Sequence, residues 1–318
     1  MSEKLLVRRA AVLGAGVMGA QIAAHLTNAG VDTVLFDLAA KEGPASAVVG
    51  KAIANLGKLS PAPLADRALA ARIVPANYDT DLALLEECDL VIEAIAERMD
   101  WKQDLYRKVV PHIAAHAVLA SNTSGLGINT LADVLPDALK PRFCGVHFFN
   151  PPRYMHLAEL IPAQGTDKAV LEGLETFLTT QLGKGVVYAR DTPNFIGNRI
   201  GVFSILATAH HTAQSGLGFD EVDAITGPLI GRPKSATYRT SDVVGLDTMA
   251  HVIKTMQENL NEQSDPFYGN FGTPKVLQKL LDLGFLGQKT KQGFYKRVGR
   301  ETMQFELDSE DYIPAGGK

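Results

Sequence analysis

The amino-acid sequence predicts an α/β protein, with a doubly wound sheet domain followed by a mostly α-helical domain. Three observations lead to this prediction. Short apolar runs alternate with longer helical stretches up to about residue 190, which is the rhythm of parallel strands joined by crossover helices. A glycine-rich turn directly follows the first of these runs. From about residue 191 the strand-like runs stop, and only helical patterns continue.

The elements are expected in a regular order along the chain. Strands are expected at 9–13, 33–36, 89–93 and 118–121 and around Val146 and Leu160, with helices at 17–29, 41–59 and 99–113. Further helices are expected at 195–214, 220–226, 243–259 and 273–283. Glycines, Asp191 and Pro193 interrupt the pattern between the two parts. We therefore expect a sheet domain at 1–190, a helical domain at 191–300 and an acidic, linker-like tail at 301–318.

The composition excludes several classes of protein. Hydrophobic residues make up 46% of the 318 residues and charged residues 21%, as in a soluble globular protein. The 31 basic and 35 acidic residues give a net charge of -4, which argues against nucleic acid as the partner. No apolar run is long enough to span a bilayer, and the first strand leaves no room for a cleavable signal. The only cysteines, Cys88 and Cys144, suit a reducing compartment, so we expect a cytoplasmic protein.

A glycine fingerprint indicates a nucleotide site. The run Gly14-Ala15-Gly16-Val17-Met18-Gly19 follows the first strand and opens an apolar helix. Gly14 suits the tight turn, Gly16 lets a pyrophosphate approach the backbone, and Gly19 lets helix and strand pack closely. We expect this whole turn to bind a dinucleotide at the helix N-terminus, in a Rossmann-type domain. A tight turn without a ligand is the alternative interpretation.

The end of the second strand indicates which cofactor is bound. Asp37 follows the apolar residues 33–36, where a carboxylate accepts hydrogen bonds from the adenosine ribose hydroxyls. A 2′-phosphate would be repelled there, and Leu38 supplies no guanidinium to offset the repulsion, although Lys41 lies nearby. NAD is therefore the expected cofactor, and NADP is the alternative.

Among the eight histidines, His147 has the surroundings of a catalytic base. It lies in an apolar strand that runs into the turn-forming residues 150–153, and a return strand follows. If the turn is centred near Arg153, His147 and Glu159 fall opposite one another on the two strands. Glu159 interrupts an apolar run, where a carboxylate needs a partner. Such a pair fixes the imidazole tautomer, as required of a base that takes an alcohol proton while hydride leaves carbon.

The same residues fit other interpretations. The pair of His147 and Glu159 fits a structural hydrogen bond between strands about as well as it fits catalysis. A hydrolase triad with Ser124 is disfavoured because the Gly-x-Ser-x-Gly turn is missing. Cys144 is three residues from His147, which places the two on opposite faces of a strand. We expect no metal site, since the helical spacing of the histidines at 112 and 116 has no third ligand beside it.

A further polar segment follows the strand at 118–121. The run Ser121-Asn122-Thr123-Ser124-Gly125 lies at what would be the carboxyl edge of the sheet, where open α/β folds bind ligands. A loop that caps the following helix explains the same residues. Both uses are compatible with each other.

Four segments together resemble the 3-hydroxyacyl-CoA dehydrogenase family. They are Gly14-x-Gly16-x-x-Gly19, Ser121-Asn122-Thr123-Ser124, His147-Phe148-Phe149-Asn150-Pro151 and the sequence DTPNFIGNR at 191–199. The last two are more specific than the glycine fingerprint, and the similarity covers roughly residues 7–297. The resemblance implies NAD-dependent oxidation of L-3-hydroxyacyl-CoA to 3-ketoacyl-CoA in fatty acid β-oxidation.

The resemblance also implies roles at the catalytic site. His147 would be the general base, and Glu159 would be its partner. Ser124 and Asn198 would hold the hydroxyl and thioester oxygens of the substrate, and Asn150 would support the site.

Further roles are implied around the cofactor and in the assembly. The residues placed around NAD are Asp37, Glu97, Lys102 and Asn122. The helical region at 191–300 is similar to the family's substrate and dimerising domain, so a homodimer is expected.

One segment departs from the short members of the family. Residues Gly231-Arg232-Pro233-Lys234-Ser235-Ala236-Thr237 replace a Pro-x-Gly-Pro loop and are similar to the long, multidomain bacterial β-oxidation enzymes. Those enzymes carry an enoyl-CoA hydratase region downstream, and no hydratase-like segment is present in these 318 residues. We therefore expect a dehydrogenase portion, which is either complete in itself or part of a longer chain, and no hydratase activity.

Two other functions fit the same residues. One is a dehydrogenase of a free hydroxy acid or sugar acid that uses the same base and cofactor without CoA. The other is a nucleotide-binding protein without turnover, against which the presence of both His147 and Glu159 speaks. Basic residues at 51, 58 and 67 lie in a helical, proline-interrupted segment that could meet the phosphates of CoA, but a solvated helix face explains them better, and we assign none of them to CoA. The sequence does not specify the acyl chain length.

Overall fold

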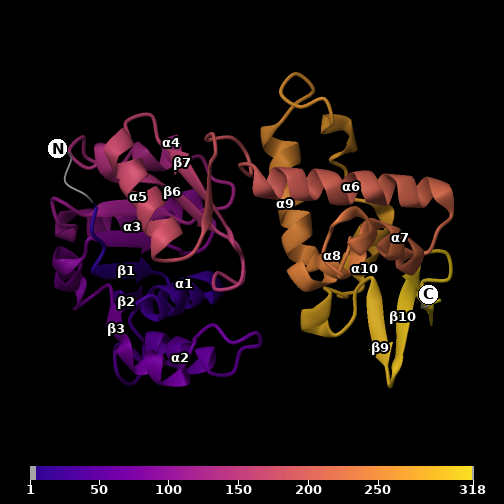
Figure 1. Ribbon diagram of the computed structural model, residues 1–318, viewed down its shortest axis with the longest axis horizontal. Helices are drawn as coiled ribbons and strands as arrows, with labels where there is room; N and C mark the ends of the chain where they lie inside the picture. The colour runs from indigo at the N-terminus through magenta and orange to yellow at the C-terminus, as the bar shows by residue number, and fades with distance from the viewer. Residues whose placement is uncertain (1–4, 317–318) are drawn as a thin grey trace. The chain divides into compact units, whose positions relative to one another are not determined.

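The computed structural model describes residues 5–316 and shows two compact units, which divide between Phe195 and Ile196 (Figure 1). The boundary expected at residue 190 lies slightly before this division. Each unit has a hydrophobic core of its own, and the first unit has a core on each face of its sheet.

The first unit is a doubly wound sheet, as the sequence predicts. Its strands lie in the order β3-β2-β1-β4-β5-β6-β7-β8, and all neighbours are parallel except β6 and β7. From β1 the sheet grows toward β3 on one side and toward β8 on the other, so the strand order reverses between β1 and β4. Doubly wound sheets bind ligands at the carboxyl ends of the strands at such a point. The strands are β1 Arg9–Leu13, β2 Asp32–Asp37, β3 Ile73–Asn77, β4 Leu90–Glu93, β5 Val118–Ser121, β6 Phe143–Phe148, β7 Leu157–Pro162 and β8 Gly185–Tyr188.

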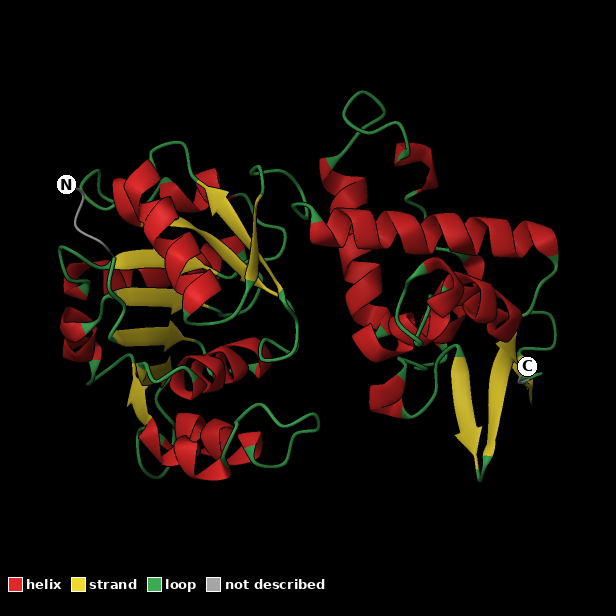
Figure 2. Cartoon of the chain, in the orientation of Figure 1, coloured by secondary structure: helices red, strands yellow, loops and turns green. Residues whose placement is uncertain are grey.

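Helices cover both faces of this sheet (Figure 2). Successive strand residues point to opposite faces, so Ala10 and Val12 pack against α1, α2 and α5, whereas Ala11 and Leu13 pack in the core that contains α3 and α4. The helices are α1 Val17–Asn28, α2 Ala47–Leu56, α3 Met99–Val109, α4 Ile128–Ala132 and α5 Lys168–Thr180.

Some elements of the first unit differ from the prediction. The helix expected at 41–59 begins only at Ala47, because a turn that contains Gly43 and Pro44 precedes it. The edge strands β3 and β8 were missed, and β3 contains Pro75, which sequence rules count against a strand. Since α3 ends at Val109, the histidines at 112 and 116 do not share an α-helix.

The second unit is mostly helical, and its helices are α6 Gly197–Ser215, α7 Phe219–Thr226, α8 Tyr238–Val244, α9 Leu246–Asn259 and α10 Lys275–Asp282. The single helix expected at 243–259 is wrong at its start. Gly245 has a φ of +97°, outside the helical region, so α8 ends before it and α9 begins after it.

The expectation of a linker-like tail from residue 301 is also wrong. Strands β9 Tyr295–Val298, β10 Glu301–Glu306 and β11 Asp311–Pro314 form an antiparallel sheet in the order β11-β10-β9. Phe305 is 2% exposed in the core of the second unit, and its ring centroid lies 5.5 Å from that of Tyr312. The acidic composition of this segment suggests a linker, but these two aromatic side chains anchor it to the second unit. The last two residues, Gly317 and Lys318, lie outside the described part of the chain.

Within residues 5–316, none of the helices combines the length and the apolar character that a bilayer span requires.

Candidate active site

The glycine turn between β1 and α1 has the geometry that its sequence predicts. Gly14 adopts a φ of +106°, and a Cβ there would lie 2.8 Å from the carbonyl oxygen of Ala94. A Cβ on Gly19 would lie 1.8 Å from the oxygen of Gly14, so helix and turn pack as closely as only glycine permits. A Cβ on Gly16 would meet no atom within 4 Å, so the protein's own packing does not require glycine there. The space above Gly16 is open to a ligand, and Val17 beside it is 69% exposed.

The carboxylate of Asp37 lies beside this turn. Its Oδ2 accepts a hydrogen bond from the Ala15 N–H at 2.6 Å, and its Oδ1 accepts one from the Leu38 N–H at 2.7 Å. No side chain caps the N-terminus of α1, so the first N–H groups of this 12-residue helix are available to a phosphate. The turn thus combines an open backbone approach, a free helix N-terminus and a carboxylate at the end of β2, which are the features that an NAD site requires. The placement of the pyrophosphate at Gly16 and of the adenosine ribose at Asp37 stays a prediction.

The predicted pairing of His147 with Glu159 is confirmed. The two residues are directly opposed in the antiparallel pair of β6 and β7, and His147 Nδ1 lies 2.7 Å from Glu159 Oε2. Both are buried, with Glu159 0% and His147 5% exposed. A carboxylate only accepts, so Nδ1 donates, and the neutral imidazole carries an unprotonated Nε2. Within residues 5–316, Nε2 has no hydrogen-bond partner.

Apolar and polar neighbours hold this imidazole. The rings of Phe149 and Phe195 lie with their centroids 4.5 and 5.8 Å from that of His147. Asn122, just after β5, accepts a hydrogen bond at its Oδ1 from the Phe148 N–H at 2.9 Å, which fixes the end of β6. Asn122 therefore supports the strand that carries His147, and its contact with NAD stays a prediction.

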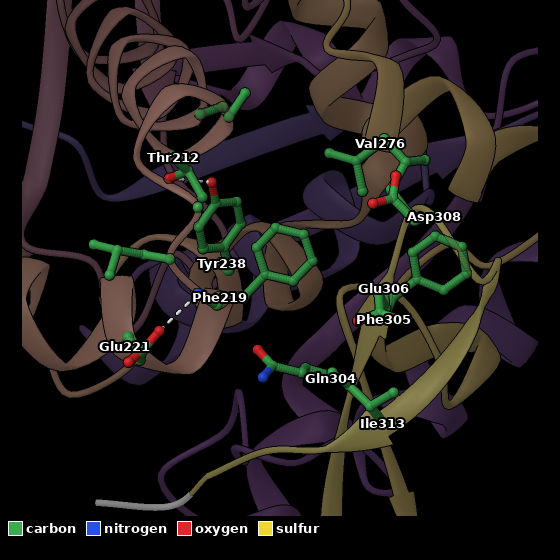
Figure 3. Close-up of a pocket in the computed structure, with 16 residues that line it drawn as sticks. Thr212, Phe219, Glu221, Tyr238, Val276, Gln304, Phe305, Glu306, Asp308 and Ile313 are labelled. Carbon is green, nitrogen blue, oxygen red and sulfur yellow. Dashed lines mark hydrogen bonds between the residues drawn. The ribbon is translucent and has the colours of Figure 1, made fainter.

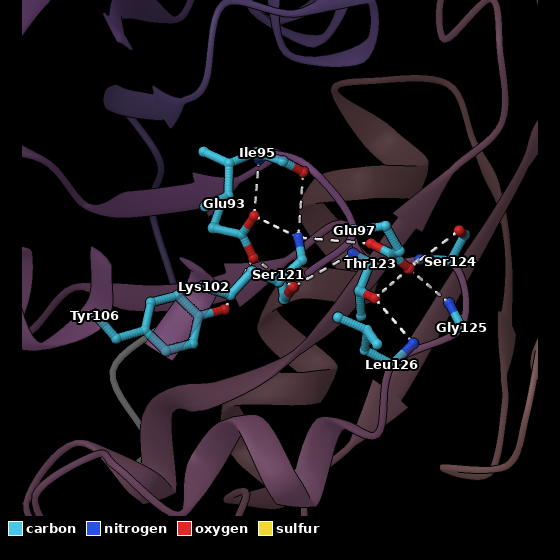
Figure 4. Close-up of polar contacts among 10 residues, drawn as sticks. All are labelled: Glu93, Ile95, Glu97, Lys102, Tyr106, Ser121, Thr123, Ser124, Gly125 and Leu126. Carbon is cyan, nitrogen blue, oxygen red and sulfur yellow. Dashed lines mark hydrogen bonds and ion pairs between the residues drawn. The ribbon is translucent and has the colours of Figure 1, made fainter. Parts of the chain in front are cut away.

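The loop after β5 closes around a carboxylate that comes from another segment (Figure 4). Glu97 Oε1 accepts hydrogen bonds from the Thr123 hydroxyl at 2.6 Å, the Ser124 N–H at 2.7 Å and the Gly125 N–H at 2.9 Å. The Ser124 hydroxyl also lies 3.2 Å from this oxygen. Burial raises the pKa of Glu97, but the Lys102 ammonium and the donated hydrogen bonds outweigh it, so the pKa falls below its usual value. The charged carboxylate therefore organises the loop that presents Ser124.

Lys102 has a different use from the one expected. It is 1% exposed, and its ammonium lies 2.5 Å from Glu93 Oε1 and 3.6 Å from Glu97 Oε2 (Figure 4). A cation enclosed in this way does not face a ligand. Its contribution to a dinucleotide site, on this geometry, is to hold Glu97 in place rather than to touch NAD.

Two residues next to the site were missed in the sequence. Glu93 ends β4 and is fully buried, and Gln21 on α1 donates a hydrogen bond to Asn150 Oδ1 at 3.1 Å. A carboxylate that ends an otherwise apolar strand was a usable signal for Glu93. Gln21 gave no such signal, because its partner is 129 residues away along the chain.

Two further residues named from the sequence are Cys144 and Asn198. Burial raises the pKa of the Cys144 thiol to about 12, which leaves it unreactive as a nucleophile. Asn198 is the second residue of α6 and belongs to the second unit, so its role stays a prediction. That unit has a pocket of about 510 Å³ beside Thr212, Tyr238 and Gln304, and none of the candidate site residues lines it (Figure 3).

Comparison with known proteins identifies the family. Residues 9–192 match the model described as 3-hydroxyacyl-CoA dehydrogenase, NAD binding domain, and residues 195–297 match that of the C-terminal domain. The chain belongs to the 3-hydroxyacyl-CoA dehydrogenase family. The first unit therefore contains the NAD-binding domain of this family, with the glycine turn and Asp37 within it.

Individual members of the family support this assignment over most of the chain. A probable 3-hydroxyacyl-CoA dehydrogenase of Bacillus subtilis is 41% identical over 95% of this chain, which spans 40% of that protein. A putative fatty acid oxidation complex trifunctional enzyme of Rickettsia prowazekii is 36% identical over 91% of this chain, which again spans 40% of the relative. The crystal structure of (S)-3-hydroxybutyryl-CoA dehydrogenase from Ralstonia eutropha is 29% identical, with a TM-score of 0.71, covering 91% of this chain and 98% of that one. The length of the first two relatives agrees with the similarity of residues 231–237 to long enzymes.

Proposed function

We propose that the protein oxidises the 3-hydroxyl group of an L-3-hydroxyacyl-CoA to the ketone, with NAD as the hydride acceptor, and that it serves fatty acid β-oxidation. The observation that carries the proposal is the buried pair of His147 and Glu159, with the Nε2 of the imidazole left as a base in an NAD-binding domain of this family. A histidine that only joined two strands would not need a nitrogen free of protein partners.

Different side chains of the protein have different roles in the proposed reaction. His147 Nε2 removes the proton of the substrate hydroxyl. NAD held at the glycine turn and Asp37 would supply the acceptor for the hydride of C3. Glu159 keeps Nδ1 protonated, so that the lone pair is always on Nε2, and it stabilises the imidazolium that forms. The Ser124 hydroxyl orients the oxygens of the substrate, and Asn150 supports them. For Asn198 we retain the substrate-binding role that the resemblance to the family implies.

The surroundings of the imidazole favour this role. The rings of Phe149 and Phe195 limit water around a charge pair that exists only after proton transfer. In the reverse direction the same imidazolium returns its proton to the 3-ketone oxygen as hydride arrives at C3. The pair thus serves oxidation and reduction alike.

The second unit supports a proposed homodimer. Large apolar side chains are exposed on it, among them Ile200 at 62%, Leu229 at 78% and Ile230 at 57%. A second copy of the chain would cover them. The cytoplasm, a reducing compartment, is the location we propose, because both cysteines are buried free thiols.

The test is an NADH absorbance assay with 3-ketoacyl-CoA substrates of several lengths. The same acids without CoA and NADPH in place of NADH are assayed in parallel. We expect NADH-dependent reduction of the CoA thioesters, with little reduction of the free acids and little use of NADPH. Equal rates with the CoA-free acids, or no turnover with any thioester, would contradict the proposal.

A further inference from the structure

A polar face of α1 makes contacts that the reaction described above does not use. Gln21, His25 and Asn28 follow one another at intervals of four and three residues, so they share one face of the helix. Each reaches a segment far away in the sequence: Gln21 contacts Asn150, His25 contacts the Leu182 carbonyl at 3.1 Å, and Asn28 holds residues 63–65. The helix that would receive the dinucleotide is therefore tied to the turn that follows the catalytic strand.

The hydrogen bonds of Gln21 determine which way its own amide faces. Its side chain is buried, and Nε2 lies 3.1 Å from the carbonyl oxygen of Val17 and 3.1 Å from Asn150 Oδ1. A backbone carbonyl only accepts, so the Gln21 atom that faces it must be the nitrogen. The same nitrogen then meets the Asn150 side chain, which must present its oxygen to it.

The orientation of Asn150 follows from that of Gln21. With Oδ1 engaged, the Nδ2 group is left as the polar end that Asn150 offers to a ligand. Asn150 is exposed, and no partner of Nδ2 occurs within residues 5–316. An amide held in this way donates hydrogen bonds, so the atom that it recognises must be an acceptor.

The backbone of the turn is fixed independently of Gln21. The buried Lys184 donates hydrogen bonds to the carbonyls of Pro152 and Met155, and burial lowers its pKa to about 8. Arg153 donates to the carbonyl of Leu64 at 2.8 Å, on the far side of the turn. Lys184 and Arg153 therefore fix the backbone of the turn. The Asn150 side chain can still rotate, and its hydrogen bond with Gln21 fixes that rotation.

We propose that Gln21 is a positioning residue, which holds Asn150 with its Nδ2 group toward the substrate so that Asn150 donates a hydrogen bond to an oxygen of the acyl thioester. The inference rests on the proposed function. It specifies that Asn150 is the donor in its hydrogen bond with the substrate. A substitution of Gln21 can therefore have two consequences: the hydrogen bond to Asn150 is lost, or the Asn150 amide reverses its orientation.

The test compares Gln21→Glu with Gln21→Leu, using the KM for a 3-ketoacyl-CoA, kcat and the affinity for NADH. A carboxylate keeps the shape of Gln21 but cannot donate, so Asn150 turns its Nδ2 inward and offers an oxygen to the substrate. We expect Gln21→Glu to raise KM about 10-fold, in line with the loss of one hydrogen bond at the acceptor, and Gln21→Leu to raise it less. NADH affinity should stay as in the wild type. Asn150→Ala should remove the effect of both substitutions, because their target is gone.

The outcomes separate this inference from the proposed function. A role of Gln21 in packing alone predicts the reverse order, with the isosteric Gln21→Glu closer to the wild type than Gln21→Leu, and that order would overturn the inference. Effects that persist in the Asn150→Ala background, or that fall on NADH affinity, would overturn it as well. Absence of turnover in the wild type would contradict the proposed function instead. The control is Thr27→Val on the same helix, which should leave KM unchanged. Among the described residues, the buried Thr27 hydroxyl donates a hydrogen bond to the Ala23 carbonyl and to no other group. Thermal unfolding of each variant shows that it is folded.

Discussion

Two buried carboxylates on separate strands of the sheet, β4 and β7, have different surroundings. Glu93 and Glu159 are both 0% exposed, and both sit on strands of the same sheet. Glu93 accepts hydrogen bonds from the Ile95 N–H, the Lys102 ammonium and the hydroxyls of Tyr106 and Ser121, all at 3.0 Å or less. Every one of these donors belongs to the protein, so the cluster is closed. Glu159 instead faces an imidazole whose second nitrogen has no partner in the described part of the chain.

The difference shows how a structural carboxylate is told from a catalytic one in this fold. Both carboxylates are buried and both have a hydrogen-bond partner, so neither burial nor the presence of a partner decides the matter. What decides it is whether the partner keeps an unused donor or acceptor. The Lys102 ammonium contacts Glu93, Glu97 and the Ile95 carbonyl, whereas His147 bonds to Glu159 through Nδ1 and has Nε2 available for a substrate.

The largest effect is expected for His147→Gln. The amide keeps a polar group near Glu159 but removes the base, so turnover should fall about 10²- to 10⁴-fold. NADH affinity should change little, because the glycine turn and Asp37 are untouched. Steady-state kinetics and NADH fluorescence titration measure the two quantities. Turnover close to that of the wild type would remove His147 from the mechanism and make its pair with Glu159 structural.

A smaller loss of activity is expected for Glu159→Gln. The imidazole stays in place, but a neutral amide no longer fixes its tautomer or stabilises the imidazolium, so kcat should fall roughly 10²-fold. The pH dependence of kcat should also change, since the charge beside the base is gone. If kcat and its pH profile both stay as they are, Glu159 serves only to hold the strand.

The main response of the closed cluster is expected in stability. Lys102→Met leaves the Glu93 carboxylate buried without its cation, which should lower the free energy of unfolding by about 3 to 5 kcal/mol. The matched control is Lys108→Met on the same helix, whose pair with Asp79 is exposed and should cost less than about 1 kcal/mol. Urea unfolding of both variants gives the comparison. An equal loss of unfolding free energy in the two variants would show that the buried ion pair stabilises the protein no more than the exposed one.

The smallest effect concerns His25, a histidine without a carboxylate partner. Desolvation, with the nearby Lys184 charge, lowers the pKa of His25 from 6.5 to about 4. Between these values the unfolded chain binds a proton that the folded chain does not, so the free energy of unfolding falls as the pH drops from about 6.5 to about 4. The part due to His25 is at most about 3 kcal/mol, and His25→Gln should remove it. Urea unfolding between pH 4 and 7 tests this, and an unchanged slope in the variant would contradict it.

Local patterns allowed much of the fold and the centre of the site to be predicted. The pairing of His147 with Glu159 depends on one hairpin turn, so symmetry about Arg153 was enough to find it. The glycine turn and Asp37 follow from residues within one strand-helix-strand unit. The family motifs added Ser124 and Asn198, whose sequence neighbours alone do not specify their chemistry.

What the sequence did not reveal depends on contacts between distant segments. The Glu97 carboxylate is held by a loop 26 to 28 residues away, and the contact of Gln21 with Asn150 spans 129 residues. The enclosure of Lys102 follows from the strands packed around it, which no local pattern encodes. The strands at 301–314 were missed because their anchors, Phe305 and Tyr312, stand among acidic residues that suggest a linker.

The most direct test of the account is a crystal structure of the protein with NAD and a 3-ketoacyl-CoA bound together. We expect His147 Nε2 to lie within about 2.6 to 3.2 Å of the C3 oxygen of the substrate, with Nδ1 still bonded to Glu159. A C3 oxygen that lies out of reach of Nε2, or a Glu159 turned away from the imidazole, would contradict it.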